Sequence, residues 1–174
     1  MPGPFGQIFH MARLYFVKGD TAINNVVYHK IFSGDTTTGS TPVSPIAFIR
    51  EQNKQVYCRH YLVNFFNDEY LLYDFNLTVG DTFAFPEVMD SVRMVVTAIN
   101  TEMTATGLRK AYDFTIISNP VSVFYMPPRW VEGIGDISNG VLPREVPPFD
   151  WSPQPLCFSD STGIIWTWAG STCR

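Results

Sequence analysis

The sequence has little charge and no cluster of cations. Only 16% of its 174 residues are charged, and 12 Lys and Arg against 16 Asp and Glu give a formal net charge of −4. The Lys and Arg residues are scattered singly along the chain. A nucleic-acid-binding protein needs a basic stripe to neutralise phosphates, and a protein that binds anionic lipid needs a basic cluster. The sequence therefore argues against nucleic acid and against an anionic membrane surface as partners.

Long apolar runs are also absent. A helix that spans a membrane needs about 18 or more consecutive apolar residues, and no such run occurs, so no membrane span is predicted. The first residues, "MPGPFGQIFHMARLYF", lack a basic head followed by an unbroken apolar core, which a signal peptide requires. If the protein is exported, we therefore expect its leader to be missing from this chain.

Histidine and cysteine are scarce and are not spaced as metal ligands. The three histidines, His10, His29 and His60, form no H-x-H or H-x3-H pair, and the three cysteines form no CxxC motif. No G-x-S-x-G motif occurs either, so a serine hydrolase triad has no local signal. We therefore predict no metal and no cofactor.

Two of the cysteines, Cys157 and Cys173, flank a segment that is predicted to form a hairpin followed by a tail. A disulfide between them would contribute about 3 kcal/mol in the loop-entropy model. Such a bond is expected only if the protein is exported. The alternative is two separate buried thiols. Cys58 would then be the odd thiol, most simply a buried strand residue.

What the chain does contain favours β-structure. Aromatic residues make up 15% of it, and 12 Gly and 13 Pro supply many turns. Hairpin turns are predicted at Asn24-Asn25, at 52–54 and at Thr106-Gly107, with a final hairpin in "LCFSDSTGIIWTW". "EYLLYDF" is predicted as a strand. We predict an all-β domain, an antiparallel meander that forms a roll or barrel-like domain, with a two-sheet β-sandwich as the alternative.

A single domain over residues 1–174 is expected. It would have an N-terminal arm at 1–12 and a C-terminal hairpin at 156–174. Between them, residues 119–155 carry prolines at eight positions and read as long loops that cover one end of the sheet. Loops held on a rigid scaffold are where binding residues concentrate, so the candidate site is sought there.

The segment "RWVEGIGDISNG", residues 129–140, carries most of the candidate chemistry. Its glycines do not make a phosphate loop, because no helix follows them. Its oxygen-bearing side chains could hold calcium, although their spacing is not that of an EF-hand. Glu132 and Asp136, together with Asp150, could form the carboxylate pair of a glycoside hydrolase. The alternatives are solvated acids, or a shaped turn whose acids bond backbone donors.

Aromatic side chains give the strongest hint of binding. All four tryptophans lie at or after position 130, and a flat aromatic face suits stacking on sugars or peptides. The candidate ligand-binding residues are Trp130, Trp151, Tyr125 and Asn139. The alternative is that the same rings pack the core.

Three stretches together, "EYLLYDFNLTVGDTF", "WVEGIGDISNGVL" and "LCFSDSTGIIW", resemble an uncharacterised β-rich domain of exported Bacteroidetes proteins associated with type IX secretion. The resemblance also covers "VKGDTAINNVVYHKIF" and "IAFIREQNKQVY", and so most of residues 14–173. It implies a secreted or cell-surface location, marks the segment from Trp130 to Gly140 as a family signature, and implies that Cys157 and Cys173 recur together. It implies no activity, and this chain departs from the family in lacking a leader and a sorting tail.

These observations lead to two functional hypotheses. The first is an exported, non-catalytic module that binds polysaccharide or cell-surface material through loop aromatics. The second is a small secreted hydrolase that cleaves glycosidic bonds with paired carboxylates. If Trp130 and Trp151 are exposed and two carboxyl groups face each other beside them, the hydrolase is favoured. If the tryptophans are buried and Glu132 bonds backbone amides, both hypotheses give way to a purely structural role. No oligomeric state is predicted.

Overall fold

The chain folds into β-strands joined by tight turns. The computed structural model describes residues 13–35, 44–60, 69–84, 92–118, 126–140, 142, 157–160 and 163–167, and these contain no helix. Within these ranges there is accordingly no apolar helix that could cross a membrane. The strands are β1 (Arg13–Ile23), β2 (Val26–Asp35), β3 (Ala47–Gln52), β4 (Gln55–His60), β5 (Tyr70–Asp74), β6 (Thr82–Ala84), β7 (Arg93–Thr104), β8 (Gly107–Ser118), β9 (Arg129–Val131), β10 (Gly135–Asp136), β11 (Cys157–Asp160) and β12 (Gly163–Thr167).

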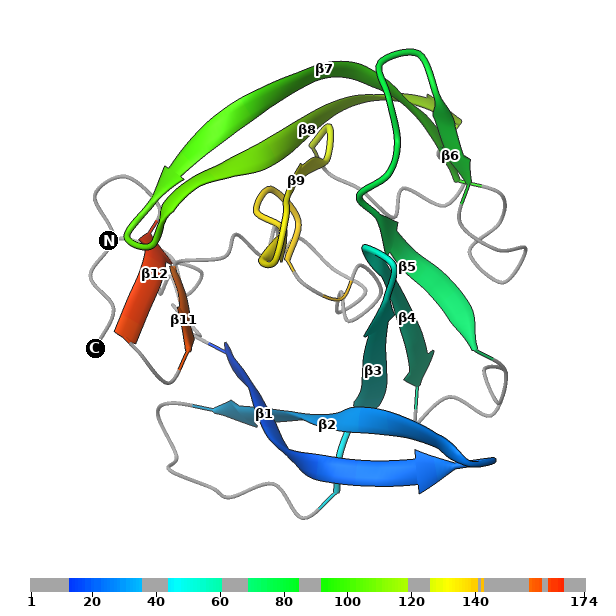
Figure 1. The fold of residues 1–174 in the computed structure, drawn as a ribbon, viewed down its shortest axis with the longest axis vertical. Helices are drawn as coiled ribbons and strands as arrows, with labels where there is room; N and C mark the ends of the chain where they lie inside the picture. Colours follow the sequence, from blue (N-terminus) through cyan, green and yellow to red (C-terminus); the bar gives the residue numbers. More distant parts are fainter. Residues whose placement is uncertain are drawn as a thin grey trace, which may run out of the picture. The chain divides into compact units, whose positions relative to one another are not determined.

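The strands pair with their neighbours in the chain. One five-stranded sheet has the order β1-β2-β3-β4-β5, another has the order β10-β9-β8-β7-β6, and β11 pairs with β12. The sheets are antiparallel, and strand order follows chain order throughout, as in a meander (Figure 1). The prediction of an all-β, antiparallel meander is therefore confirmed.

By its internal contacts the chain divides into two compact units, Met1–Leu72 and Tyr73–Arg174. The first holds strands β1 to β4, the second holds β6 to β12, and β5 spans the division. The candidate segment at 129–140 belongs to the second unit.

The predicted hairpin turns lie where the sequence places them. Asn24 and Asn25 connect β1 to β2 with φ of 51° and 63°, and Asn53 and Lys54 connect β3 to β4 with φ of 52° and 62°. Two successive residues with positive φ make the type I′ turn that matches the twist of an antiparallel hairpin. The third predicted turn joins β7 to β8, with Gly107 at φ 119°. All three hairpins, and the fourth formed by β11 and β12, are confirmed.

The core of the first unit includes a buried residue from each of its central strands. Ile31 of β2, Ala47 of β3 and Cys58 of β4 are buried. Cys58 is a free thiol, and burial raises its pKa to about 12. Because the thiolate is the reactive form, this cysteine is a packing residue, as predicted.

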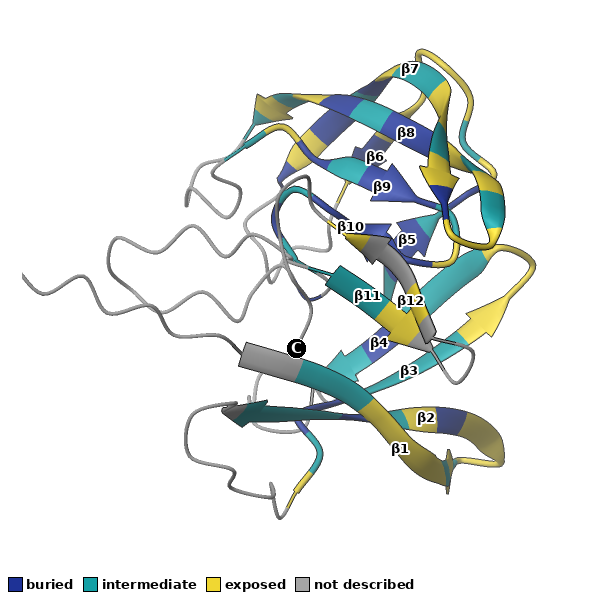
Figure 2. Ribbon diagram, turned by 90° about the vertical axis from the view of Figure 1, so that its left-hand side faces the viewer, coloured by how far each residue is buried: buried dark blue, intermediate teal, exposed yellow. Residues whose placement is uncertain are grey.

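The core of the second unit surrounds Trp130, which is fully buried. Four aromatic rings lie around its ring, with centroid distances of 4.4 to 6.4 Å. They are Tyr73, Phe75, Phe83 and Phe114. Edge-to-face arrangements of this kind add to the free energy gained from burial. Figure 2 shows β9 largely buried beside β8, whose buried residues lie near its middle, with half-buried and exposed residues towards its ends.

Cys157, the first residue of β11, is disulfide-bonded. Its predicted partner, Cys173, lies outside the described residues, so the pairing of the two stays a prediction. The predicted N-terminal arm at 1–12 also lies outside them.

Candidate functional site

The segment "RWVEGIGDISNG" is a small hairpin, not a long loop. β9 pairs with β8, with Trp130 opposite Tyr112, and then turns back through residues 132–134 to pair with β10. The turn is closed by the Ile134 amide, which donates to the Val131 carbonyl at 2.9 Å. Within 119–155, which was predicted to be rich in loops, residues 129–131 and 135–136 form two short strands that extend the sheet of the second unit.

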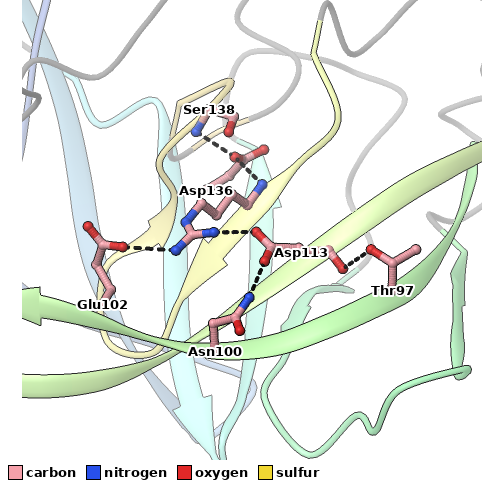
Figure 3. Close-up of polar contacts among 7 residues, drawn as sticks. Thr97, Asn100, Glu102, Asp113, Asp136 and Ser138 are labelled. Carbon is pink, nitrogen blue, oxygen red and sulfur yellow. Dashed lines mark hydrogen bonds and ion pairs between the residues drawn. The ribbon is translucent and has the colours of Figure 1, made fainter.

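The Asp136 carboxylate lies at the centre of this segment and is 2% exposed. Its Oδ1 accepts the backbone N–H groups of Ser138 at 2.8 Å, Asn139 at 3.2 Å and Arg129 at 3.3 Å. Its Oδ2 accepts Nδ2 of Asn139 at 3.0 Å. Burial raises the pKa of Asp136 to about 6, and the four N–H donors act in the opposite direction. Figure 3 shows the bond to Ser138, the shortest of the four.

Asn139 also makes its hydrogen bonds within the segment and to Met126, which precedes it. It is 5% exposed, and its amide forms a two-way bridge to Met126, donating to the Met126 carbonyl at 3.1 Å and accepting the Met126 amide at 3.3 Å. Together with the bond to Asp136, these contacts tie the start of the segment to its end. Asn139 was predicted to bind ligand, and its burial and these internal bonds give that role no support.

Trp130 was predicted to offer a flat face to a ligand, but it is 0% exposed and offers none. The alternative, that the ring packs the core, describes what is seen. Among the described residues, the indole N–H of Trp130 has no hydrogen-bond acceptor. It is enclosed by aromatic rings, which are the weak acceptors available to it.

Glu132 holds the hairpin to β8 through its backbone. Its amide donates to the Lys110 carbonyl at 2.9 Å, and its carbonyl accepts Nη1 of Arg109 at 3.2 Å. Gly133 follows at φ 76°, with the Arg109 guanidinium filling the space that a Cβ would occupy. The predicted catalytic pairing of Glu132 with Asp136 gains no support, because the Asp136 carboxylate is buried and bonded to donors of its own segment.

An ion-pair network on the neighbouring strands was not predicted. Arg129 bridges two carboxylates, with Nη2 at 2.9 Å from Glu102 and Nη1 at 2.5 Å from Asp113. Asn100 donates to the second oxygen of Asp113 at 2.7 Å, and Thr97 donates to its backbone carbonyl at 3.1 Å (Figure 3). These groups come from β7, β8 and β9, and the register that brings them together is the only signal that could have found them. The network is internally satisfied and ties three strands together.

Three of the predicted site residues, Tyr125, Asp150 and Trp151, lie outside the described residues, and their proposed roles stay predictions. Across the ranges that the structure describes, no group of three His, Cys, Asp or Glu side chains is placed to hold a metal ion.

Comparison with protein-family models, with curated proteins and with solved structures found no match to this chain.

Proposed function

We propose that the protein is an exported, non-catalytic β-module that binds polysaccharide or cell-surface material. The observation that carries the non-catalytic part is the state of Asp136. Both oxygens of its carboxylate accept N–H groups of residues 129–139, and the side chain is buried. The carboxylate of Asp136, the central acid of the candidate site, therefore stabilises the backbone conformation of its own segment.

The hydrolase alternative needs carboxyl groups that reach a substrate. A general acid must come within hydrogen-bond distance of the glycosidic oxygen, with the second carboxylate across the scissile bond. A carboxylate that is 2% exposed cannot do this without opening the segment around it. Asp150 could still serve a hydrolase, and for this reason the test below measures cleavage as well as binding.

The binding part of the proposal rests on composition and on two further aromatic residues that the sequence offers. The chain is aromatic-rich and poor in charge, which suits contact with sugar rings better than contact with phosphates. We propose Trp151 and Tyr125 as contacts. We likewise propose an exported location, which is supported by the resemblance to exported Bacteroidetes domains.

The test is a glycan array together with a panel of chromogenic glycosides, both with the full chain. Binding on the array without release of chromophore is the expected result. Release that is lost in Asp150→Asn would instead establish the hydrolase, and silence in both assays would overturn both functions. Trp151→Ala and Tyr125→Ala on the same array then test whether these two aromatics make the contact.

A further inference from the structure

The segment 129–140 ends in an asparagine that is followed by a glycine, Asn139-Gly140, and no other asparagine of the sequence precedes a glycine. The side-chain carbon Cγ of an asparagine is electrophilic, and covalent bonds tether it close to the backbone nitrogen of the next residue. When that next residue is glycine, no Cβ shields the nitrogen. Asn139 and Gly140 therefore carry the two groups that can convert an asparagine to an acid without an enzyme.

Bulk around Gly140 does not prevent this reaction. Gly140 is half-buried and has a φ of 96°. Apart from its chain neighbours, no heavy atom of the described residues lies within 4 Å of the place where a Cβ would stand. A restraint on the reaction must therefore come from the contacts of Asn139.

The Asn139 amide is held at both of its ends. Its Nδ2 carries two protons and has two acceptors, Asp136 Oδ2 at 3.0 Å and the Met126 carbonyl at 3.1 Å. Its Oδ1 accepts the Met126 amide at 3.3 Å. A flipped amide would turn its own oxygen towards the two acceptor oxygens, so these contacts fix one orientation of the amide group.

These contacts oppose the step that breaks the Cγ–Nδ2 bond. Nδ2 must leave as ammonia, so the Asp136 carboxylate and the Met126 carbonyl both lose a donor. Asp136 is 2% exposed and Asn139 is 5% exposed, so water replaces that donor only when the segment opens. The reaction therefore proceeds from a locally opened state, and its rate is reduced in proportion to the fraction of time that the segment spends open.

We propose that Asn139-Gly140 is a site of spontaneous deamidation that reacts only when the segment 129–140 opens. The Gly140 nitrogen forms a bond to Asn139 Cγ, and the Cγ–Nδ2 bond breaks. The amide proton of Gly140 leaves with Nδ2 as ammonia, and a cyclic imide remains. Water then adds to one of the two imide carbonyls, which gives aspartate from one and isoaspartate from the other. No electrons are transferred, and water is the one reagent consumed.

The acid that forms at position 139 cannot restore the contacts of the asparagine. It has no Nδ2 protons, so it places oxygens against the Asp136 carboxylate and the Met126 carbonyl. Two carboxylates that share a buried site repel one another, and isoaspartate also adds a methylene group to the backbone. Each conversion therefore favours the open segment, and because ammonia is lost the change accumulates with time.

The test follows Asn139 in the full chain, in buffer and in denaturing urea, at the same mildly alkaline pH and temperature. Peptide mapping by mass spectrometry measures aspartate and isoaspartate at each asparagine. In urea we expect Asn139 to react fastest of the asparagines, because it alone precedes a glycine. In buffer we expect its conversion to be slower than in urea by about tenfold or more.

Two variants locate the restraint. Asp136→Ala removes one acceptor of Nδ2 and is expected to speed the conversion of Asn139 in buffer by about tenfold or more. Ser138→Ala is the matched control, because Ser138 contacts Asp136 through its backbone amide, and it is expected to react as the wild type does. Circular dichroism verifies the fold. If Asp136→Ala does not fold, the comparison of the wild type in buffer and in urea decides.

Four outcomes overturn the inference. Equal rates for the wild type in buffer and in urea would show that the contacts do not restrain the Asn139 amide. A folded Asp136→Ala protein that reacts as slowly as the wild type would show that Asp136 has no part in the restraint. Conversion without isoaspartate would mean direct hydrolysis of the amide in place of the cyclic imide. If Asn139 is unchanged even in urea, it is not a modification site.

Discussion

Asn139 joins Asp136 to the beginning of the same segment. Its Nδ2 donates to Asp136 Oδ2 at 3.0 Å and to the Met126 carbonyl at 3.1 Å, so one amide group joins Asp136 to Met126, which lies 13 positions before Asn139. The polar side chains of the candidate site therefore bond to one another and to the backbone of the same segment. These contacts give Asn139 a structural role in the segment.

Asn139→Ala is expected to destabilise the protein by about 1–3 kcal/mol, because it removes the bridge to Met126 and leaves buried polar groups without a partner. Ser138→Ala is the matched control, since the contact of Ser138 with Asp136 is made by its backbone amide. Urea unfolding of both variants measures the difference. Equal stability of the two would contradict the bridging role.

Asp136 is expected to make stability depend on pH. Its folded pKa of about 6 lies above the ordinary value of 3.8, so ionisation costs folding free energy. The protonated Asp136 carboxyl therefore stabilises the folded state relative to the ionised one, by up to about 3 kcal/mol in the free energy of unfolding. This stabilisation is fully present below about pH 4 and is lost as the pH rises through 6. Asp136→Asn retains an acceptor at Oδ1 and does not titrate.

Comparing the two proteins in urea between pH 4.5 and 7.5 cancels the titration of all other groups. The wild type is expected to gain stability relative to Asp136→Asn as pH falls. A relative loss would show that the four N–H donors outweigh burial and that the carboxylate is charged throughout.

Trp130 is expected to matter for stability and not for ligand contact. Trp130→Ala leaves a large cavity among Tyr73, Phe83 and Phe114 and should cost about 3–5 kcal/mol. Trp130→Phe should cost less, because it keeps an aromatic ring and removes an indole N–H that has no hydrogen-bond acceptor among the described residues. Unfolding curves give the costs. Glycan affinity that falls in a well-folded Trp130→Phe protein would contradict this assignment.

Gly133→Ala combines two separable penalties. A residue with a Cβ at φ 76° costs about 1–2 kcal/mol, and the new methyl group also collides with the Arg109 guanidinium. Arg109→Ala in the same chain relieves the collision and not the backbone strain. A double-mutant cycle should therefore show a cost smaller than the sum of the two single variants, and strict additivity would mean that Arg109 does not fill that space.

Cys157 and Cys173 are expected to form the disulfide, with Cys58 free. Alkylation of the unreduced, denatured protein should add one label, and alkylation after reduction should add three. Peptide mapping then identifies the labelled cysteine. Cys157→Ser/Cys173→Ser should lose about 3 kcal/mol of stability in the loop-entropy model. Three labels without reduction, or a linked peptide that contains Cys58, would refute the pairing.

Turn chemistry made much of the fold predictable. Asn24-Asn25 and Asn53-Lys54 adopt positive φ, and asparagine tolerates this conformation better than most residues. Each turn then fixes the register of two strands that alternate polar and apolar residues. Turn chemistry also explains the turn at 78–81. There the Asp81 carboxylate accepts the Thr78 amide and hydroxyl, and Gly80 has a φ of 96°.

The candidate site was much less predictable, for two physical reasons. β9 and β10 contain three and two residues, which is too short for alternation to show, and prolines on either side suggest a loop. Burial of Trp130 depends on rings from β5, β6 and β8 that the fold brings together from distant positions. A sequence shows that Trp130 and Asp136 are present, but only the tertiary structure shows that they face inward.

The central claim is that this protein binds a polysaccharide and does not cleave it, and one incubation tests it directly. The full chain is mixed with a polysaccharide that it binds on the glycan array. Bound protein and new reducing ends are then measured in the same sample. The account predicts saturable binding with no increase in reducing ends above a heat-denatured control. A steady increase that follows protein concentration, and that is abolished in Asp150→Asn or Asp136→Asn, would contradict it.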